Sequence, residues 1–552
     1  MAYGPSFAIP YLFDDHSTIE QNAYLAHADT WEWLTRVPEN STLIGRIVLS
    51  WSFGLNALLF GHDPTVYHFF NLLIHLANVL LVALLVRRGL AYTNLAEPLR
   101  DWAAVAAALV WGVHPLNVNA VGYLIQRGES LSALWLLLTL YAWIRAQERK
   151  PNTGWYAVAC AGPLLCAATK EQGWIVPFVP LLWAWIFLER GPREEVRRHP
   201  ALYASGVASW LLLAGLTFTS GRIAHVGAEP TVDTWSYFIT QPGVLTHYVR
   251  LFFVPIGQSF DYDWPVSTLP GAAPFVLLWV ALFGATTFAV WKRNAAGFPA
   301  ALAFLSLATS SSFLPLPDLA FEHRFYLAGA CVAAICAGLF AHLFPRAAAA
   351  RSALVGCAAV ALAVLTWQRC TLFHDEFAVW SEAVERNPTQ RRALSNVGGM
   401  LLARHQPRAA LDMFRRIEAV GIPSRMQTRV NLHIGNALFD LGRYDESRAY
   451  YEKTLTTLNG DPGPIYQNIG HTYIEQDDYP NARKAFERGL TTTTQLASLH
   501  FDLAYACAEL SDTECMIGAY LRGIALGGRP QSALSELVAI YRPDLVKGST
   551  SR

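Results

Sequence analysis

Long apolar runs separated by short charged breaks fill the chain from Val66 to Trp367. Ten runs can be delimited: Val66–Val86, Trp102–Pro115, Ser130–Arg145, Trp155–Thr169, Trp174–Leu188, Ala201–Phe218, Phe275–Trp291, Phe298–Leu314, Phe325–Phe344 and Ser352–Trp367. A helix that crosses a bilayer needs about 17–25 apolar residues, and in hydrocarbon every backbone polar group must be paired internally. We therefore predict an all-α fold whose core is a bundle of about ten transmembrane helices.

The overall composition agrees with a membrane protein. Of the 552 residues, 53% are hydrophobic and only 15% are charged, whereas a soluble domain has about 25% charged residues. The 42 basic and 42 acidic residues cancel, which argues against a nucleic-acid-binding protein, because such proteins carry a strongly basic surface. Intrinsic disorder is excluded by the richness in apolar and aromatic residues.

The basic residues predict how the bundle is oriented. Fourteen Lys and Arg residues fall in the loops on one side of the runs. The opposite loops hold five: Arg127, Lys170, Arg222, Arg250 and Arg324. The richer side is cytoplasmic by the positive-inside rule. The first 65 residues and everything after about Gln368 then lie outside. We predict a bacterial inner membrane with a periplasmic C-terminal region, or a luminal one in the endoplasmic reticulum of a eukaryote.

A repeat follows the last apolar run. Gly398, Ala410 and Phe414 are separated by 12 and 4 residues. The same offsets recur in Gly435, Ser447 and Tyr451, in Gly470, Ala482 and Phe486, and in Ala504, Met516 and Tyr520. This spacing is typical of tetratricopeptide repeats, α-solenoids whose concave face commonly holds a peptide. We predict four repeats preceded by a half repeat at Phe373–Pro388.

These patterns divide the chain into four predicted parts. Residues 1–65 form an external first loop with an interfacial helix, residues 66–368 the bundle, residues 369–530 the repeats and residues 531–552 a tail. The interfacial helix is expected in the apolar, amphipathic stretch that contains Arg46 and Asn56.

Two adjacent carboxylates, Asp14 and Asp15, stand in the first loop within "YLFDDHSTIEQNAYLAH". Two like charges in a cleft of low dielectric raise one pKa, which suits a general base. The alternative is that one of the two caps a helix that starts near Ser17.

Other polar residues cluster in the remaining outer loops. They are His114 and Arg127 in "HPLNVNAVGYLIQRGES", Lys170 and Glu171 in "TKEQG", Asp261 and Asp263 in "QSFDYDWP", and Glu322, His323 and Arg324 in "LPDLAFEHRFYL". The cations among them could bind the phosphate of a lipid carrier, or each could simply extend to the membrane surface. The D-x-D spacing of Asp261 and Asp263 could hold a divalent ion, although such pairs occur often by chance. No Cys/His spacing resembles a zinc site.

The first apolar run carries His68, Asn71, His75 and Asn78, spaced by 3, 4 and 3 residues and hence on one helix face. Polar groups in a membrane usually face the bundle interior. We expect either interhelical hydrogen bonds or one wall of a cavity.

Of the eight cysteines, Cys507 and Cys515 fall near the turn between the two helices of the fourth repeat. They form a disulfide if this region lies in an oxidising compartment, or remain two buried thiols.

The ordered segments "FDDHSTIEQN", "YHFFNLLIHLANVLLVALL", "HPLNVNAVGYLIQRGESLSAL", "KEQG" and "EHRFYL", followed by the repeats, are similar to the transmembrane-and-TPR O-mannosyltransferase-like proteins. These belong to the GT-C superfamily of membrane glycosyltransferases. The resemblance implies a polyprenyl-phosphate-linked sugar as donor and an active site at the outer membrane face. Relatives enter the first outer loop through one more helix, which would make eleven spans.

The resemblance also implies roles for single residues. Asp14 and Asp15 match the acidic pair whose carboxylate serves as base or positions the acceptor. Arg127 stands where relatives have the Arg of a "GRAD"-like motif. Glu322 and Arg324 match a Glu-Arg pair, here with His323 inserted between them.

We therefore expect Asp14 or Asp15 to accept the proton of an acceptor hydroxyl that attacks the anomeric carbon of the sugar, which is mannose by resemblance. A single displacement of this kind inverts the anomeric centre. Arg127, Lys170 and Arg324 are expected to stabilise the departing phosphate, with hydrogen bonds from His114 and His323 and support from Glu171, Glu322, Asp261 and Asp263. No resident metal and no cofactor other than the donor is predicted.

Two alternatives remain. The acceptor could be a lipid or a polysaccharide, or the protein could be a scaffold without enzymatic activity. The repeats favour a protein acceptor held in their groove, and ten helices exceed what an anchor requires.

Overall fold

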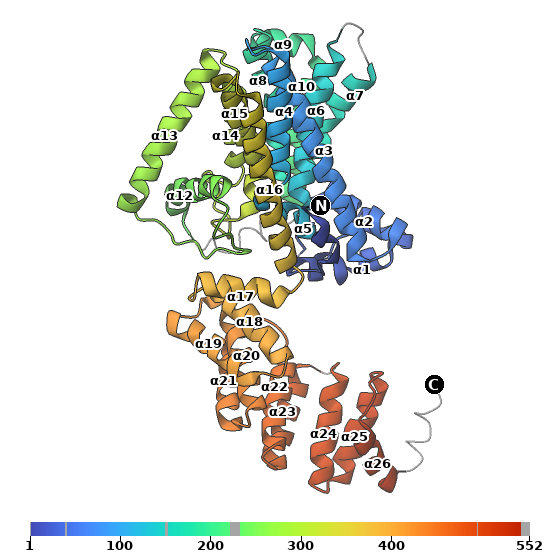
Figure 1. Cartoon of the computed structure of the whole chain (residues 1–552). Coiled ribbons are helices and arrows are strands. Elements are labelled where there is room, and N and C mark those ends of the chain that lie inside the picture. The colour runs from blue at the N-terminus through green and yellow to red at the C-terminus, as the bar shows by residue number, and fades with distance from the viewer. Residues whose placement is uncertain (1, 39–40, 149–152, 221–231, 494, 543–552) are drawn as a thin grey trace. The chain divides into compact units, whose positions relative to one another are not determined.

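The computed structural model describes residues 2–38, 41–148, 153–220, 232–493 and 495–542. Every regular element in these ranges is helical. The chain divides into two compact units, Met1–Arg386 and Asn387–Arg552, which we describe separately (Figure 1). Arg149, Lys150, Arg222 and the last part of the predicted tail lie outside the described residues.

Each of the ten apolar runs contains a helix. These are α3 (Pro64–Leu90), α4 (Glu97–Gly112), α6 (Arg127–Ala146), α7 (Thr153–Ala167), α8 (Phe178–Phe187), α10 (Pro200–Thr219), α13 (Leu269–Trp291), α14 (Gly297–Ala308), α15 (Tyr326–Leu343) and α16 (Ala348–Leu372). The prediction of an all-α integral membrane protein is confirmed.

By length and composition, fewer helices qualify as membrane spans than the ten that the sequence predicts. Among the described residues, five helical segments are long and apolar enough to cross a membrane, or up to seven if two bent helix pairs count as one span each. The first bent pair joins α4 to the segment Pro115–Gly122, and the second joins Glu171–Phe187 to α9 (Pro192–Arg198). Helices α7 and α14 are shorter, with 15 and 12 residues, so ten spans remain a prediction.

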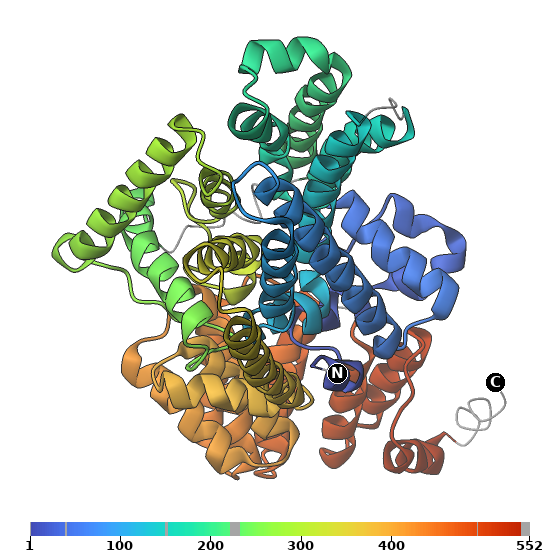
Figure 2. The same cartoon turned by 45° about the horizontal axis from the view of Figure 1, so that its top comes forward.

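Helix α12 (Thr234–Phe253) lies in a stretch that the sequence analysis left as an outer loop. Pro242 and Arg250 interrupt its apolar character, which explains why the apolar pattern missed it. It packs against α13, which packs in turn against α14. Helix α13 lies at the rim of the first unit (Figure 2) and exposes large apolar side chains such as Leu277 and Val280, as a lipid-facing helix does.

The polar face of α3 satisfies backbone carbonyls of the bent segment. The chain turns by 55° between α4 and the segment that holds η5 (Pro115–Asn117) and α5 (Val118–Gly122). His75 Nε2 donates to the carbonyl of Gly112 over 2.9 Å, and Asn71 Nδ2 donates to that of Val121 over 3.2 Å. In a membrane the carbonyls at such a break need partners from neighbouring helices. Of the two alternatives for this face, the structure shows interhelical hydrogen bonding.

The first 65 residues form short helical segments, including η2 (His16–Glu20), α1 (Ala23–Ala26) and α2 (Ile47–Phe60). Helix α2 exposes Trp51, Leu55 and Leu59 on successive turns. This is the pattern of a helix that rests at a bilayer surface.

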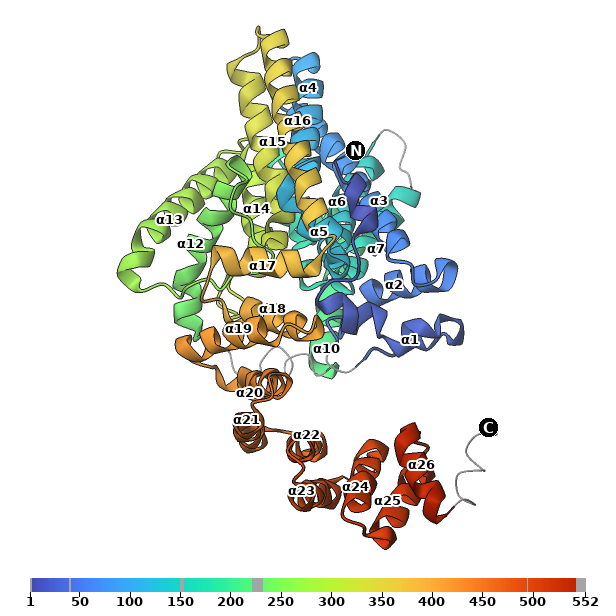
Figure 3. The same cartoon turned by 60° about the horizontal axis from the view of Figure 1, so that its bottom comes forward.

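The second unit consists of stacked helix pairs (Figures 1 and 3). They are α18 (Arg391–Ala403) with α19 (Pro407–Val420), α20 (Ser424–Asp440) with α21 (Tyr444–Thr457), α22 (Gly463–Ile474) with α23 (Tyr479–Thr492), and α24 (Ala497–Glu509) with α25 (Thr513–Ala525). A β-carbon on Gly470 would lie 2.1 Å from the ring of Phe486. The repeated small residue is thus required where the aromatic ring of the second helix packs on the first.

Two short helices flank the repeats. Helix α26 (Ser532–Tyr541) lies within the predicted tail and buries Leu534 and Val538 in the core of the last repeat. Helix α17 (Glu376–Arg386) falls in the predicted half repeat. By its contacts α17 groups with the first unit, which ends at Arg386 rather than at the predicted boundary after residue 368.

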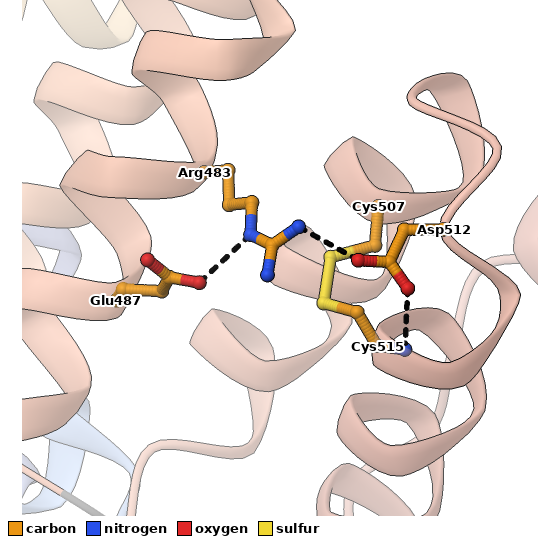
Figure 4. Close-up of a disulfide and its surroundings, with 5 residues drawn as sticks. All are labelled: Arg483, Glu487, Cys507, Asp512 and Cys515. Carbon is orange, nitrogen blue, oxygen red and sulfur yellow. Dashed lines mark hydrogen bonds and ion pairs between the residues drawn. A yellow bond between two sulfur atoms is a disulfide. The ribbon is translucent and has the colours of Figure 1, made fainter.

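Cys507 and Cys515 form a disulfide across the turn between α24 and α25 (Figure 4). The same joint holds an ion-pair triad in which Arg483 of α23 bridges Glu487 and Asp512, with both N–O distances at 2.8 Å. Asp512 also accepts a hydrogen bond from the backbone N–H of Cys515 and so caps α25. Of the two alternatives for these cysteines, the structure shows the disulfide.

Candidate active site

The two carboxylates of the acidic pair have different surroundings. Asp15 is completely buried, and its two oxygens accept the backbone N–H groups of Leu12, at 3.2 Å, and Ile125, at 2.9 Å. Asp14 is partly exposed, and its own backbone N–H donates to the hydroxyl of Tyr123 over 3.1 Å. Asp15 precedes η2 without capping it through its side chain, so the capping alternative does not hold for Asp15.

Burial raises the pKa of Asp15 to about 8, against the effect of its two amide hydrogen bonds, which favour the charged form. The negative charge of Asp14 raises it further. Asp15 therefore holds its proton at pH 7 and the pair carries one negative charge, on Asp14. A partly exposed carboxylate next to a neutral one is suited to accept a proton from a bound hydroxyl.

The backbone before the pair is strained. Phe13 has φ of 44°, in the left-handed region that residues with a side chain rarely adopt. Such a conformation costs of order 1–3 kcal/mol and persists only where surrounding contacts hold it. Here the strained residue directly precedes the acidic pair.

Arg127, a predicted phosphate ligand, is fully buried at the start of α6. Its guanidinium donates to the side chains of Asn71 and Asn56 and to the backbone carbonyls of Ser52 and Tyr67. It also lies 4.2 Å from the ring centre of Phe53. Since these partners occupy most of its N–H groups, the guanidinium joins α2, α3 and α6. Its role toward a donor phosphate stays a prediction.

Lys170 belongs to a second cluster of polar side chains and is less deeply buried than Arg127. Its ammonium is 2.5 Å from the carboxylate of Glu129, which also accepts a hydrogen bond from Gln172 at 3.0 Å and lies 4.0 Å from His323 Nε2. Burial lowers the pKa of Lys170 to about 8, although Glu129 favours the charged form. Lys170 and His323 were predicted as neighbours of the phosphate; Glu129, which binds Lys170 and lies near His323, was not singled out.

Two arginines border the Lys170 group. Arg46 pairs with the predicted supporting residue Glu171 over 3.4 Å, and its Nε is buried without a hydrogen-bond partner. Arg324 is partly exposed, donates to the carbonyl of Leu319 over 3.4 Å and repels Lys170 electrostatically. We call Arg46, Lys170, Arg324, His323 and Glu129 the cationic cluster. Arg46 was noted only as part of the interfacial stretch, although an Arg in an apolar outer segment is itself a signal of function.

His114 was predicted to contact the phosphate but is buried in the bend after α4. Nε2 donates to the carbonyl of Phe252 over 2.9 Å, and Nδ1 accepts the backbone N–H of Leu116 at 3.2 Å. Both ring nitrogens are engaged with the protein, so the histidine fixes the bend.

Glu322 anchors the loop between α12 and α13. It accepts hydrogen bonds from the hydroxyl of Tyr262 at 2.6 Å, from the backbone N–H of Ser259 at 2.9 Å and from Gln258 at 2.9 Å. In the same loop Asp261 is buried and Asp263 is exposed. Within the described ranges, no group of three or more His, Cys, Asp or Glu residues is arranged to hold a metal ion.

One short segment joins the acidic pair to the cationic cluster. Tyr123 and Ile125 bind Asp14 and Asp15, and Glu129 binds Lys170. Tyr123, which binds Asp14, and Glu129, which binds Lys170, are six residues apart, at most about 22 Å of backbone. The acidic pair and the cationic cluster therefore contact the same short segment, residues 123–129.

Comparison with known proteins adds the following. The tetratricopeptide repeat family matches residues 427–495. The protein O-mannosyl-transferase Tmtc3 of Drosophila melanogaster is 24% identical over 538 residues, which cover 82% of this chain and 57% of that protein. The protein O-mannosyl-transferase tmtc2 of Xenopus laevis is 27% identical over 304 residues, covering 49% of this chain and 34% of that protein.

Among solved structures, ArnT from Cupriavidus metallidurans bound to undecaprenyl phosphate overlaps with a TM-score of 0.37 at 15% identity, covering 83% of this chain and 79% of that one. The chain spans 57% of the length of the Drosophila relative and 34% of that of the Xenopus relative. The resemblance expected from the sequence is confirmed: this chain is similar to protein O-mannosyl-transferases of the Tmtc type, over 82% of its length for the Drosophila protein and 49% for the Xenopus protein, and it carries tetratricopeptide repeats.

Proposed function

We propose that this protein is a membrane glycosyltransferase. It moves one sugar, mannose by similarity to its relatives, from a polyprenyl-phosphate carrier to a hydroxyl of an acceptor protein at the outer membrane face. The observation that carries the proposal is the placement of Asp14 and the cationic cluster at the two ends of the segment 123–129.

In the proposed reaction, Asp14 accepts the proton of the acceptor hydroxyl while its oxygen attacks the anomeric carbon. The bond from this carbon to the phosphate oxygen breaks, and the electron pair leaves with the phosphate. The anomeric centre is inverted. Lys170, Arg46 and Arg324 stabilise the charge that develops on the departing phosphate, because cations in a partly dehydrated site act more strongly than in water.

We assign Asp15 a different task. Because it is neutral at pH 7 and bound to the amides of Leu12 and Ile125, it positions the loop and leaves Asp14 as the base.

The second unit supports a protein acceptor. The repeats contain a cavity of about 560 Å³. Its walls include the aromatic rings of Phe439, Phe486, Phe501 and Tyr505 and the paired His471 and Asp502, 3.0 Å apart. Aromatic rings beside a polar His–Asp contact suit an extended peptide. A segment of the acceptor held here would be concentrated near the membrane.

The disulfide Cys507–Cys515 supports a location of the repeats outside the cytosol, since disulfides persist in oxidising compartments. We propose a bacterial inner membrane with periplasmic repeats; the alternative is the endoplasmic reticulum with luminal repeats.

The test is sugar transfer in membranes that contain the protein, with membranes lacking it as control. Radiolabelled polyprenyl-phosphate mannose is supplied, then the same carrier with glucose or N-acetylglucosamine. We expect label to enter protein from the mannose donor. Label in lipid or polysaccharide would move the proposal to the other acceptor class. No transfer from any of these donors would contradict the proposed enzyme and favour the scaffold.

A further inference from the structure

Helix α17 holds the loop that carries the acidic pair, and Glu376 makes the contact. Its Oε1 accepts the backbone N–H of Phe13 at 3.0 Å and the indole N–H of Trp380 at 3.2 Å. Its Oε2 lies 3.2 Å from Nε2 of His16. The two residues that flank the acidic pair, Phe13 and His16, therefore share one carboxylate from a helix about 360 positions later in the chain.

Other contacts support this joint. The ring of Phe13 packs edge-on against Trp380, with ring centres 5.1 Å apart, and Phe260 packs against the same indole at 5.3 Å. His374, just before α17, donates through Nε2 to the carbonyl of Pro5 over 2.7 Å. The N-terminal segment and α17 lie side by side in Figure 3. These contacts all lie within the first unit.

The charges at the joint favour the contact. His16 faces two carboxylates, Glu376 and Glu20, the latter 2.6 Å from its Nδ1. The hydrogen bond to Glu376, together with Glu20, raises the pKa of His16 to about 9 despite partial burial. The imidazole is therefore protonated at pH 7, and both of its N–H groups donate to carboxylates.

The strained turn at Phe13 explains why the contact from Glu376 is needed to fix this loop. Phe13 adopts φ of 44°, and Asp14 follows directly. A left-handed conformation at an aromatic residue is maintained by external contacts. The amide of Phe13 is fixed by Glu376, and that of Asp14 by the hydroxyl of Tyr123. Without Glu376 the turn can relax, and the Asp14 carboxylate then loses its direction.

We propose that Glu376 is a positioning residue for the base Asp14: by binding the Phe13 amide and His16 at once, it fixes the acidic loop against α17. The inference rests on the proposed function. It gives α17 a part in the reaction. The chain continues directly from α17 into the repeats at Asn387. Neither the apolar pattern nor the resemblance pointed to this residue.

The test uses the full-length protein and three variants. Glu376→Ala removes both oxygens. Glu376→Gln keeps an acceptor for the Phe13 amide but removes the charge. Glu385→Ala is the control, because this exposed residue on α17 is nine positions away, about 2.5 helical turns, and hence on the opposite face.

The first readout is amide hydrogen exchange of peptides that cover residues 11–20. We expect faster exchange in Glu376→Ala, a smaller change in Glu376→Gln and none in Glu385→Ala. Exchange in Glu376→Ala at the wild-type rate would overturn the structural part of the inference, whether or not the protein transfers sugar.

The second readout is the split between kcat and KM in the transfer assay. We expect kcat to fall at least tenfold in Glu376→Ala, with the KM for the donor unchanged within about twofold, and Glu376→Gln to recover most of the loss. A wild-type kcat in Glu376→Ala would overturn the inference. If the wild-type protein itself transferred no sugar, the proposed function would fall together with the positioning role, while the exchange data would still decide the contact.

Discussion

Arg127 and Lys170 belong to two polar regions of the same bundle that look alike in the sequence and differ in the structure. The guanidinium of Arg127 is enclosed by carbonyl and amide oxygens from α2 and α3. The ammonium of Lys170 has one carboxylate partner, Glu129, and further cations beside it. Asp15 and Asp14 differ in exposure: Asp15 is buried with two amide partners, and Asp14 is partly exposed. We infer that enclosed groups such as Arg127 and Asp15 build the site and that more exposed groups can meet a ligand.

The largest expected effect is on folding, at Arg127. Replacement by Ala leaves the oxygens of Asn71, Asn56 and Tyr67 buried without their donor, each at a cost of about 1–3 kcal/mol. We expect Arg127→Ala to lower the free energy of unfolding by about 3–5 kcal/mol. Thermal unfolding in detergent measures this, with Arg36→Ala, which removes an exposed arginine, as the control. An Arg127→Ala protein of normal stability that no longer binds donor would reverse the comparison.

Lys170 should affect donor binding directly. A charged hydrogen bond to phosphate contributes about 1.5–3 kcal/mol, so Lys170→Ala should weaken donor binding about tenfold to a hundredfold. Because the variant also takes the cation from the buried Glu129, which keeps its hydrogen bond from Gln172, some stability is lost as well, and binding is compared at equal amounts of folded protein. Donor titration by initial rates tests this. Unchanged binding would exclude Lys170 from the phosphate site.

The smallest effect is a pH dependence. Burial lowers the pKa of Lys170 to about 8, so the charged form that binds phosphate is complete below this pH and is lost above it. We expect kcat/KM for the donor to fall by up to tenfold per pH unit above about 8, since this ratio reports on the free enzyme.

Lys170→Arg is the control for this pH dependence, because its guanidinium stays charged. A flat profile in the wild-type protein, or the same decline in Lys170→Arg, would contradict the assignment to Lys170.

The fold could be predicted where periodicity determines it. The apolar runs locate the bundle helices, and the offsets of Gly470, Ala482 and Phe486 locate a helix pair, because a ring must pack where only a small residue fits. Helix α12 and the number of spans could not be predicted in this way. Pro242 and Arg250 interrupt the apolar sequence of α12. Bends split other apolar segments into two helices, so that the number of spans cannot be counted from the apolar runs.

The candidate site could be predicted only in part. Residue type identified Asp14, Lys170 and Arg324 as chemically capable. It could not show that Arg127 and His114 donate their hydrogen bonds to the backbone carbonyls of Tyr67 and Phe252, since these acceptors lie on helices that are remote in the sequence. Glu129 and Glu376 were missed because each becomes relevant only through a long-range partner.

The central claim is that Asp14 is the base and Asp15 its support, and a comparison of two single variants tests it most directly. Rates of transfer from labelled polyprenyl-phosphate mannose are measured at pH 7 for Asp14→Asn and Asp15→Asn at equal amounts of folded protein. We predict a loss of about 10²–10⁴-fold for Asp14→Asn, the usual contribution of a general base. Asp15→Asn weakens one amide hydrogen bond and should cost no more than about tenfold. Transfer that survives in Asp14→Asn and disappears in Asp15→Asn would contradict the account.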